Sequence, residues 1–445
     1  MDKELKLREK LVYTGGLMGQ NMIYNFMSTY IMFFFTDLLG ITPGAATAIV
    51  VAASLWDAVN DPMMGAIADK TRSRWGKFRP YLLFGPVFIG ITTVLCFTDF
   101  RLGTSAVAVA AICYVLWGMS YTVCDIPIWA LSSVASKNPD EKNQLVTLGK
   151  IGGTVGTAIV TVCGIMLIKA FGTEREAGAY TGAALILAVI GGLLMILTSL
   201  VMRERIRPDK EAVPIRQNLR TITRNKPLKL LMISLLIVNL VNNLRQVTQM
   251  YFVVYVWGDS GQLINVGISL IIGMCLGMAV SPKLLARFEK RVVYMWACIL
   301  GFISSSLPFF VAGDSILTAL LFLGASFAFT GVTTVSSTSM LMDGIDYSEW
   351  KLGFRGEGLV FSMNTLLNKF SATLAKGILG LGLVLMHYVE NQPVTATTQW
   401  GFSFMMYLVP GICFLISMIP LFFYKISREE KDAISAMQKQ KYQEF

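Results

Sequence analysis

Long runs of apolar residues, separated by short polar connections, organise the whole chain. The runs lie at residues 11–36, 44–68, 80–98, 104–133, 147–170, 178–202, 228–257, 261–282, 292–312, 315–341, 357–386 and 399–424. Each run is long enough to cross a hydrocarbon core of about 30 Å as a helix. Because lipid offers no partners to backbone N–H and C=O groups, such runs must be helical. The residue alternation typical of a membrane β-barrel is missing. The pattern therefore predicts an all-α membrane protein with twelve transmembrane helices.

The charge of the polar connections alternates along the chain. Basic residues gather in every second connection, at 70–79, 137–142, 203–229 and 283–291. The other connections hold little beyond Arg101, Lys169 and Arg175. By the positive-inside rule the basic connections are cytoplasmic. Both termini are then also predicted to be cytoplasmic, which agrees with an even number of spans.

The longest polar break divides the chain into two halves of similar length. The predicted organisation is a six-helix bundle at 1–202, a cytoplasmic central loop at 203–227, a second six-helix bundle at 228–427 and a cytoplasmic tail at 428–445. Two six-helix halves joined by a basic central loop are typical of a two-bundle transporter, in which the binding site lies between the halves. The central loop would also serve as an ordinary solvated linker.

The composition supports a protein embedded in the lipid bilayer and excludes other classes. Of the 445 residues, 54% are hydrophobic and 15% are charged, whereas a soluble domain is about 25% charged. The net charge of +10 does not indicate a nucleic-acid partner, because the basic residues segregate by membrane side. The seven cysteines lie in or beside apolar runs without CxxC spacing, so they indicate core packing. An enzyme is disfavoured, since His387 is the only histidine and no nucleophile with a base partner is found.

A few ionisable residues fall inside the predicted spans, where a charge is costly and a functional role is the default hypothesis. The acids are Asp57, Asp61 and Asp125, and the bases are Lys150, Arg245 and Lys369. Lys150 and Lys369 could donate to substrate hydroxyls or neutralise the acids when no cation is bound. Arg245 fits either an ion pair with an acid of the opposite half or a clamp for a substrate carboxylate.

The second span carries a pair of carboxylates. Asp57 and Asp61 are four residues apart, so both project from one face of a helix, with Asn60 beside them. Two carboxylates in a dry pocket need a counter-charge or a proton. Oxygen ligands of this kind suit Na⁺ or Li⁺, or a proton held on one carboxylate. The sequence therefore predicts a metal-cation site at these three residues. The alternative is a buried ion-pair network with Lys150 or Lys369 that only fixes helix packing.

The fourth span carries a second polar stripe. Tyr121, Thr122, Asp125 and Trp129 lie at positions i, i+1, i+4 and i+8 of one helix. A carboxylate accepts hydrogen bonds from hydroxyl groups, and an indole packs against the C–H face of a pyranose. The stripe therefore predicts a sugar site. The alternative is a structural stripe, since Trp and Tyr are common in membrane helices.

The stretch 343–351 is acidic and lies between basic connections. It could pair with Lys142, Lys290 or Arg291 across the two halves and so hold the cytoplasmic side shut. The predicted gate residues are Lys142, Arg291, Asp343, Asp346, Glu349 and Arg355. As an ordinary juxtamembrane turn, the stretch would need no function.

Several motifs make the chain resemble a known family. The segments Trp56–Gly65 and Asp69–Pro80 resemble the signature of the glycoside–pentoside–hexuronide:cation symporters of the major facilitator superfamily, in particular the members that are like the melibiose permease. The likeness continues through 116–127 and 343–357, so it spans both halves. The resemblance implies a sugar symporter driven by Na⁺, Li⁺ or H⁺, located in the inner (cytoplasmic) membrane of a bacterium.

The resemblance also implies binding residues. The cation-binding positions match Asp57, Asn60, Asp61 and Thr122, with Asp125 at the border between cation and sugar, and Trp129, Thr365 and Lys369 fall on the sugar-site region. The chain departs from the family pattern at five positions, where Asn21 replaces an acid, Lys150 an arginine, Thr334 a tryptophan and Ser54 an arginine, while Arg245 is added. The lost acid and the added base favour an acidic sugar such as a uronide over melibiose. The predicted substrate-binding residues are Asn21, Tyr121, Asp125, Trp129, Lys150, Arg245, Thr365 and Lys369.

Together these features predict a secondary symporter that imports a sugar with a monovalent cation by alternating access. We expect it to work as a monomer and to need no cofactor beyond the coupling ion. Bound Na⁺ would order Asp125 and raise sugar affinity, and by linkage the sugar would raise Na⁺ affinity equally. Two alternatives remain: a cation-coupled lysolipid carrier, which an apolar lateral opening would favour, and a proton-only sugar symporter.

Overall fold

Helices form almost all of the chain in the computed structural model. The structure describes residues 5–101, 103–136, 138–205, 225–311, 315–352, 357–389 and 395–424, with Glu430 and Ala433. Within these ranges no extended strand occurs, and the only β-type pairing is an isolated bridge between Ser73 and Gly76. The prediction of an all-α membrane protein is confirmed.

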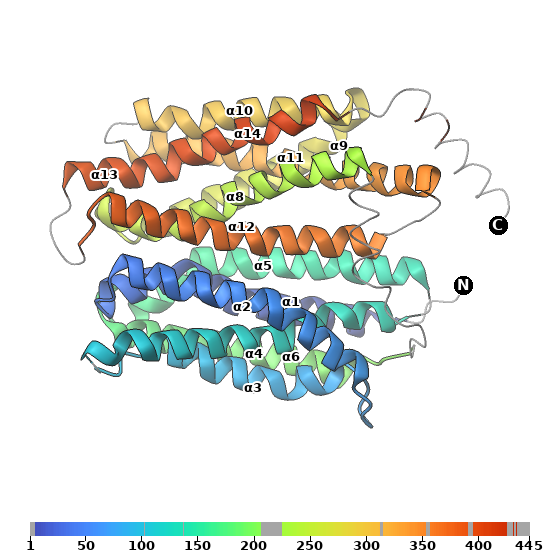
Figure 1. The fold of residues 1–445 in the computed structure, drawn as a ribbon, viewed down its shortest axis with the longest axis horizontal. Helices are drawn as coiled ribbons and strands as arrows, with labels where there is room; N and C mark the ends of the chain where they lie inside the picture. The colour runs from blue at the N-terminus through green and yellow to red at the C-terminus, as the bar shows by residue number, and fades with distance from the viewer. Residues whose placement is uncertain are drawn as a thin grey trace. The chain divides into compact units, whose positions relative to one another are not determined.

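Helices occupy every predicted span (Figure 1). The first half contains α1 (Leu7–Phe33), which continues into a π-helical turn at Phe34–Leu38, then α2 (Pro43–Lys70), α3 (Arg79–Cys96), α4 (Ala106–Val134), α5 (Pro139–Phe171) and α6 (Ala177–Val201). The second half contains α8 (Lys226–Tyr255), α9 (Gln262–Arg287), α10 (Lys290–Val311), α11 (Ile316–Leu352), α12 (Glu357–Leu385), and α13 (Ala396–Ser403), which leads through a π-helical turn at Phe404–Leu408 into α14 (Val409–Phe422).

Three of the long helices are less apolar than the rest. Nine helices among the described residues are long and apolar enough to cross a membrane, counting α13, its π-helical turn and α14 as one. The remaining long helices are α1, α2 and α12. These three helices carry polar and charged side chains within their spans, among them Asn25 of α1, Asp57 of α2 and Lys376 of α12.

The helix α11 is longer than the sequence predicts. It continues through the acidic stretch 343–351, which we expected to be a connection after a span ending at 341. The reason is a buried face that the acidic residues hide: Leu341, Ile345 and Ser348 are spaced at i, i+4 and i+7 and are all buried. Asn225, just before α8, donates its side-chain N–H to Gly344 O at 2.9 Å and so fixes this face.

The chain packs as two compact units, which are described separately. The first unit contains Met1–Lys210 with Gln249–Gly267 and Lys376–Gln399. The second contains Glu211–Thr248, Ile268–Ala375 and Trp400–Phe445. The bundle boundaries inferred from the sequence remain a prediction, and of the central loop only residues 203–205 and 225–227 are described.

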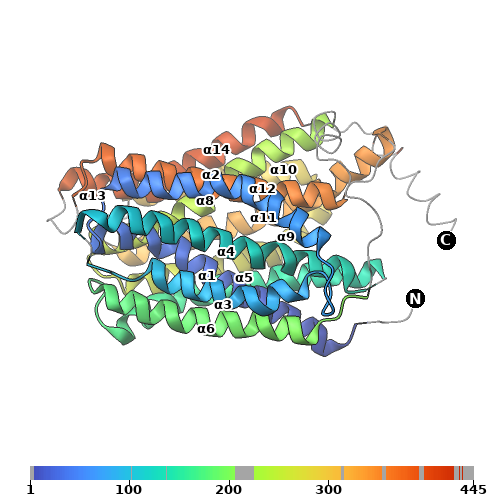
Figure 2. The same cartoon turned by 60° about the horizontal axis from the view of Figure 1, so that its bottom comes forward.

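In the first unit, α1 packs against α5 and α6, α3 packs against α4 and α6, and α2 packs against α4 (Figure 2). The contact between α1 and α5 is backbone to backbone. A Cβ atom at Gly152 or Gly156 would lie 2.2 Å from Thr14 O or 2.3 Å from Met18 O. Small residues allow such close approach between membrane helices, and here they hold the polar side chains of α1 against α5.

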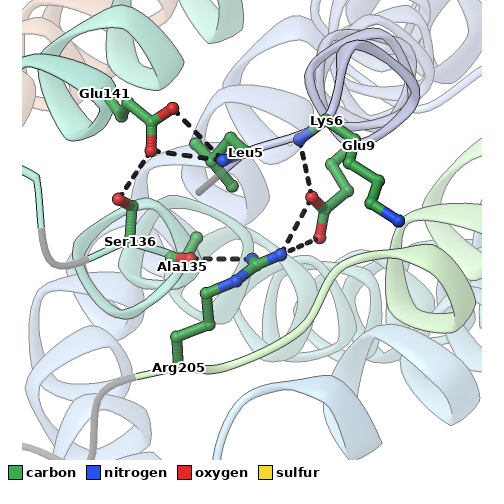
Figure 3. A network of polar contacts seen from close by, with 7 residues as sticks. All are labelled: Leu5, Lys6, Glu9, Ala135, Ser136, Glu141 and Arg205. Atoms are coloured by element: carbon green, nitrogen blue, oxygen red, sulfur yellow. Dashed lines mark hydrogen bonds and ion pairs between the residues drawn. The ribbon is translucent and has the colours of Figure 1, made fainter. Parts of the chain in front are cut away.

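Buried carboxylates tie together the helix ends near the N-terminus (Figure 3). Glu141 accepts hydrogen bonds from Leu5 N at 3.2 Å and from Ser136 Oγ at 2.7 Å. Glu9 accepts from Arg205 Nη2 at 2.9 Å, and Arg205 also donates to Ala135 O. These contacts join the start of α1, the α4–α5 connection and the segment after α6.

A third carboxylate, Glu204, holds the basic turn before α3. It accepts hydrogen bonds from the backbone N–H groups of Lys77, Phe78 and Arg79 at 2.7, 2.8 and 3.1 Å. These amides belong to the start of α3 and have no partner inside the helix. Glu204 therefore acts as a cap supplied from the end of α6.

In the second unit, α10 packs against α11 and α14. Serine side chains supply many of the contacts between helices. Ser234 of α8 donates to Ser417 O of α14 at 2.6 Å, and Ser305 of α10 donates to Tyr407 O at 2.7 Å. Hydroxyl groups thus link neighbouring helices through hydrogen bonds to main-chain carbonyls.

Candidate functional site

The carboxylates of Asp57 and Asp61 on α2 face residues at matching turns of α4. Thr122 Oγ1 donates a hydrogen bond to Asp61 Oδ1 at 2.8 Å. One turn earlier on both helices, the Asp57 carboxylate lies over Gly118, where an added Cβ would be 2.9 Å from Asp57 Oδ1. Asp57 and Asp61, as well as Gly118 and Thr122, are four residues apart, so the helices pair turn by turn. The structure therefore brings together the predicted Asp57, Asp61 and Thr122.

Asn60 supplies a further group beside the pair. The residue is buried, and its side-chain nitrogen has no hydrogen-bond partner among the described residues. The oxygen and nitrogen of an amide exchange places by a half turn of the group, so a cation ligand can stand where this nitrogen lies. Two carboxylates, a hydroxyl and an amide are oxygen ligands, which fit a hard cation. The described residues contain no group of three or more His, Cys, Asp or Glu side chains suited to a metal.

Asp125 is joined to α1 by a residue that the sequence did not suggest. The carboxylate is 7% exposed, and Asp125 Oδ1 accepts a hydrogen bond from Gln20 Nε2 at 2.7 Å. Gln20 Nε2 also donates to the hydroxyl of Tyr121, and Gln20 Oε1 accepts from Asn21 Nδ2 at 2.8 Å. The predicted Asn21, Tyr121 and Asp125 thus form one network through Gln20. Gln20 could have been found from the sequence because an otherwise apolar span carries the polar residues Gln20, Asn21, Tyr24 and Asn25.

Aromatic rings form a row along α4 next to this network. Tyr114, Trp117 and Tyr121 are stacked, with ring centroids 5.7 Å and 5.4 Å apart. Tyr24 of α1 adds a fourth ring 5.2 Å from Tyr121. The row provides an apolar surface beside hydrogen-bonding groups, the combination that a sugar ring binds. It differs from the predicted stripe, in which Trp129 was the stacking residue.

The other predicted residues of the first unit lie on its α4–α5 side. Trp129 is half-buried, and a Cβ at Gly149 of α5 would lie 3.4 Å from its ring. Lys150, the next residue of α5, is exposed in this structure.

A buried lysine was overlooked in the sequence. Lys376 of α12 is 6% exposed and donates a hydrogen bond from Nζ to Tyr114 OH at 3.0 Å. It lies inside the predicted span 357–386, so the count of three intramembrane bases was wrong. Tyr114 lies one helical turn before Gly118, the residue over which the Asp57 carboxylate lies. The basic side chain therefore belongs to the surroundings of the carboxylate pair.

Another buried acid, Asp37, lies just after the C-terminal end of α1. It lies in the π-helical turn, is 7% exposed, and accepts hydrogen bonds from the hydroxyls of Thr36, Tyr255 and Tyr388. The tyrosines come from the end of α8 and from the segment after α12. The sequence places Asp37 one residue beyond a predicted span, which is why it was missed.

Arg245, Thr365 and Lys369 lie in the second unit. Arg245 is 2% exposed and donates from Nη2 to Ser305 Oγ at 2.8 Å and Ser326 Oγ at 2.7 Å. Inside its own unit Arg245 is therefore held by two hydroxyl groups, and both the ion pair with an acid of the opposite half and the carboxylate clamp remain predictions. Thr365 is exposed and Lys369 is half-buried, both on the first half of α12. Their role as sugar ligands remains a prediction.

The predicted gate residues are found on both units. Asp343 pairs with Lys290 of its own unit at 2.6 Å, and Arg291 donates to Phe422 O at 3.1 Å. Asp346 and Glu349 lie on the extension of α11, and Lys142 lies on α5. Arg355 lies outside the described residues. The proposed pairing across the halves remains a prediction.

The long apolar helices and the paired carboxylates held between two of them define a membrane transporter. Residues 12–428 match the family model described as "MFS/sugar transport protein", and the chain belongs to this family. It is 27% identical over 417 residues to the inner membrane symporter YicJ of Escherichia coli (strain K12), covering 93% of this chain and 91% of that protein. It is 28% identical over 443 residues to the isoprimeverose transporter of Lactiplantibacillus pentosus, covering 98% of this chain and 92% of that protein.

The fold also has solved counterparts. The crystal structure of a bacterial homologue of the human lysosomal transporter Spinster, in an inward-facing and unoccupied conformation, matches with a TM-score of 0.68. The match covers 95% of this chain and 98% of that chain at 13% sequence identity, so it supports the fold alone. The family model and the relatives confirm the prediction that the chain belongs to a sugar symporter family of the major facilitator superfamily.

Proposed function

We propose that the protein is a secondary active symporter that imports a sugar together with one monovalent cation, Na⁺ in the first instance, by alternating access. The observation that carries the cation site is the register of α2 and α4, which sets Asp57 over Gly118 and Asp61 on Thr122. Asn60, which is buried and lies three residues after Asp57 on the same helix, is the fourth oxygen-bearing side chain of the proposed site. A proton would need only one of the carboxylates, whereas Na⁺ or Li⁺ uses the whole set.

The sugar site of this proposal adjoins the cation site. Asp125, Gln20 and Tyr121 offer hydrogen-bonding groups, and the stacked rings of α4 offer an apolar face. Because Thr122 and Asp125 are three residues apart on one helix, a cation at Asp61 acts directly on the sugar ligand. The similarity to the isoprimeverose transporter supports a sugar as cargo, and the similarity to the inner membrane symporter YicJ supports symport. In this proposal both termini are cytoplasmic and the protein works as a monomer.

A lysolipid carrier is less well supported. A groove of about 450 Å³ does run between α3 and α6, and all of its lining residues are non-polar. The groove offers no side chain that could bind a polar headgroup, and none of the site carboxylates lines it. An apolar surface of this kind fits the acyl chains of the surrounding bilayer.

The cation site can be tested by ligand-induced stabilisation of the purified protein. Na⁺, Li⁺ and K⁺ chlorides would be titrated at constant pH and ionic strength, with choline as the balancing cation. The proposal predicts that Na⁺ or Li⁺ raises Tm, that Asp61→Asn abolishes the shift, and that Thr122→Val weakens cation binding about tenfold or more, the effect of losing a hydrogen bond to a charged group. The exposed Asp259 gives the matched control, Asp259→Asn, which should respond as the wild type does.

The same titration is then repeated in the presence of each member of a panel of neutral glycosides and uronides. A sugar that raises Tm only in the presence of Na⁺ or Li⁺ supports symport, and its identity defines the cargo. Equal responses of the wild type and Asp61→Asn to Na⁺ would rule out the proposed cation site.

A further inference from the structure

Lys376 is a buried ammonium group with few partners. Its Nζ atom donates to Tyr114 OH at 3.0 Å, and the ring centroid of Tyr114 is 5.7 Å away. No other acceptor for Lys376 is found in the part of the chain that the structure describes. A lysine carries three N–H donors, and an ammonium taken out of water is costly unless an opposite charge lies nearby. The side chain therefore needs a counter-charge in addition to the tyrosine hydroxyl.

The position of Tyr114 identifies that counter-charge. Tyr114, Gly118 and Thr122 follow one another at successive turns of α4. The first holds Lys376, the second lies under Asp57 and the third binds Asp61. Successive turns are about 6 Å apart along a helix. One positive and two negative groups thus stand in a row, with the carboxylate of Asp57 in the middle.

We propose that Lys376 is the built-in counter-ion of Asp57, so that the site formed by Asp57, Asn60, Asp61 and Thr122 needs only one mobile cation. Two half-buried carboxylates within the membrane span require about two positive charges or protons. The lysine supplies one of them permanently, and the coupling ion supplies the other. Lys376 thereby fixes the number of cations that accompany each sugar and limits how tightly the site binds them. This inference rests on the proposed function and specifies the cation stoichiometry of the same site.

The role of Lys376 as a counter-ion differs from that of a sugar donor or a packing residue in a measurable way. Removing the lysine alone leaves both carboxylates without a fixed positive charge, so the site should attract cations more strongly. Removing Asp57 alone leaves the ammonium uncompensated. Removing both restores neutrality and leaves Asp61 to bind one cation. The effects of the two substitutions must therefore be strongly non-additive.

The experiment is a double-mutant cycle on the purified full-length protein, with Lys376→Met, Asp57→Asn and the double variant. Tm is measured in choline buffer and across a Na⁺ titration, and the number of ions bound is measured with ²²Na⁺. The inference predicts that both single variants have lower Tm than the double variant in choline. It also predicts that Lys376→Met binds Na⁺ about tenfold more tightly than the wild type or binds a second ion. Lys376→Arg keeps the charge and should keep the wild-type stoichiometry, as should the exposed control Lys229→Met.

Additive effects on Tm, or unchanged Na⁺ affinity and stoichiometry in Lys376→Met, would overturn the inference. If Lys376→Met does not fold, Tyr114→Phe and Lys376→Arg allow the same comparison, because the first removes the hydroxyl acceptor and the second retains the charge. A non-additive cycle in a protein whose wild type does not respond to Na⁺ or Li⁺ would support the pairing of Lys376 with Asp57 while rejecting Na⁺ coupling. The two proposals can therefore fail separately.

Discussion

Replacing Gly118 with alanine adds one methyl group beneath the carboxylate of Asp57. The new Cβ would lie 2.9 Å from Asp57 Oδ1, which is closer than van der Waals contact. The Asp57 carboxylate, at the far end of a flexible side chain, must shift to relieve this contact. A shifted carboxylate loses about 1–3 kcal/mol of its interaction with a bound cation, the range for an interaction with a charged group. Because the carboxylate is displaced from the cation, we expect Na⁺ binding to weaken about 5- to 150-fold.

The control for this variant lies on the partner helix. A Cβ at Gly65, one turn beyond Asp61 on α2, would meet no atom within 4 Å. Both glycine-to-alanine substitutions favour the helix by about 1 kcal/mol, but this gain is present with and without the cation and cancels in the binding constant. The assay is a Na⁺ titration monitored by thermal shift in choline-balanced buffer. Equal affinities for Gly118→Ala and Gly65→Ala would refute the placement of Asp57 as a cation ligand.

Three further predictions concern the cap of α3, the sugar network and the buried arginine. Glu204→Ala removes the acceptor of three backbone N–H groups, so the free energy of unfolding should fall by about 1–3 kcal/mol. Glu204→Gln should be closer to the wild type. An unchanged Tm for Glu204→Ala would contradict the capping role. Gln20→Leu removes the donor to Asp125 and Tyr121, so sugar binding measured by calorimetry should weaken about tenfold. Na⁺ binding without sugar should stay close to that of the wild type. Loss of Na⁺ binding alone would contradict the placement of Gln20 in the sugar network. Arg245→Met should keep or raise Tm, because Arg245 Nε and Nη1 are buried without a partner among the described residues. A selective loss of uronide binding in this variant would instead favour the carboxylate clamp.

The sequence predicts the helical architecture well because membrane spans are long and chemically uniform. The exception is α11, where acidic residues on the exposed side of 343–351 conceal the buried positions of Ile345 and Ser348. A hydropathy pattern averages both faces of a helix and so ends the span too early. Periodicity, examined position by position, would have extended the helix.

The candidate site could be predicted only in part. Asp57 and Asp61 were recognisable because two acids four residues apart in a span are rare and costly. Gln20 is neutral and therefore carries no comparable signal, although it links Asp125 to Tyr121. The pairing of Asp57 with Gly118 depends on the register of α2 against α4, which only the packed structure supplies. Lys376 could have been found in the sequence, since it is a charge inside a predicted span.

The central claim is that the protein couples sugar movement to a cation gradient through Asp61. The most direct measurement is uptake of a stabilising sugar, radiolabelled, into proteoliposomes under an inward Na⁺ gradient, with Asp61→Asn in parallel. The account predicts that the wild type accumulates sugar above its external concentration and that Asp61→Asn does not. Equilibration of the sugar without accumulation, whichever of Na⁺, Li⁺ or H⁺ forms the gradient, would contradict it.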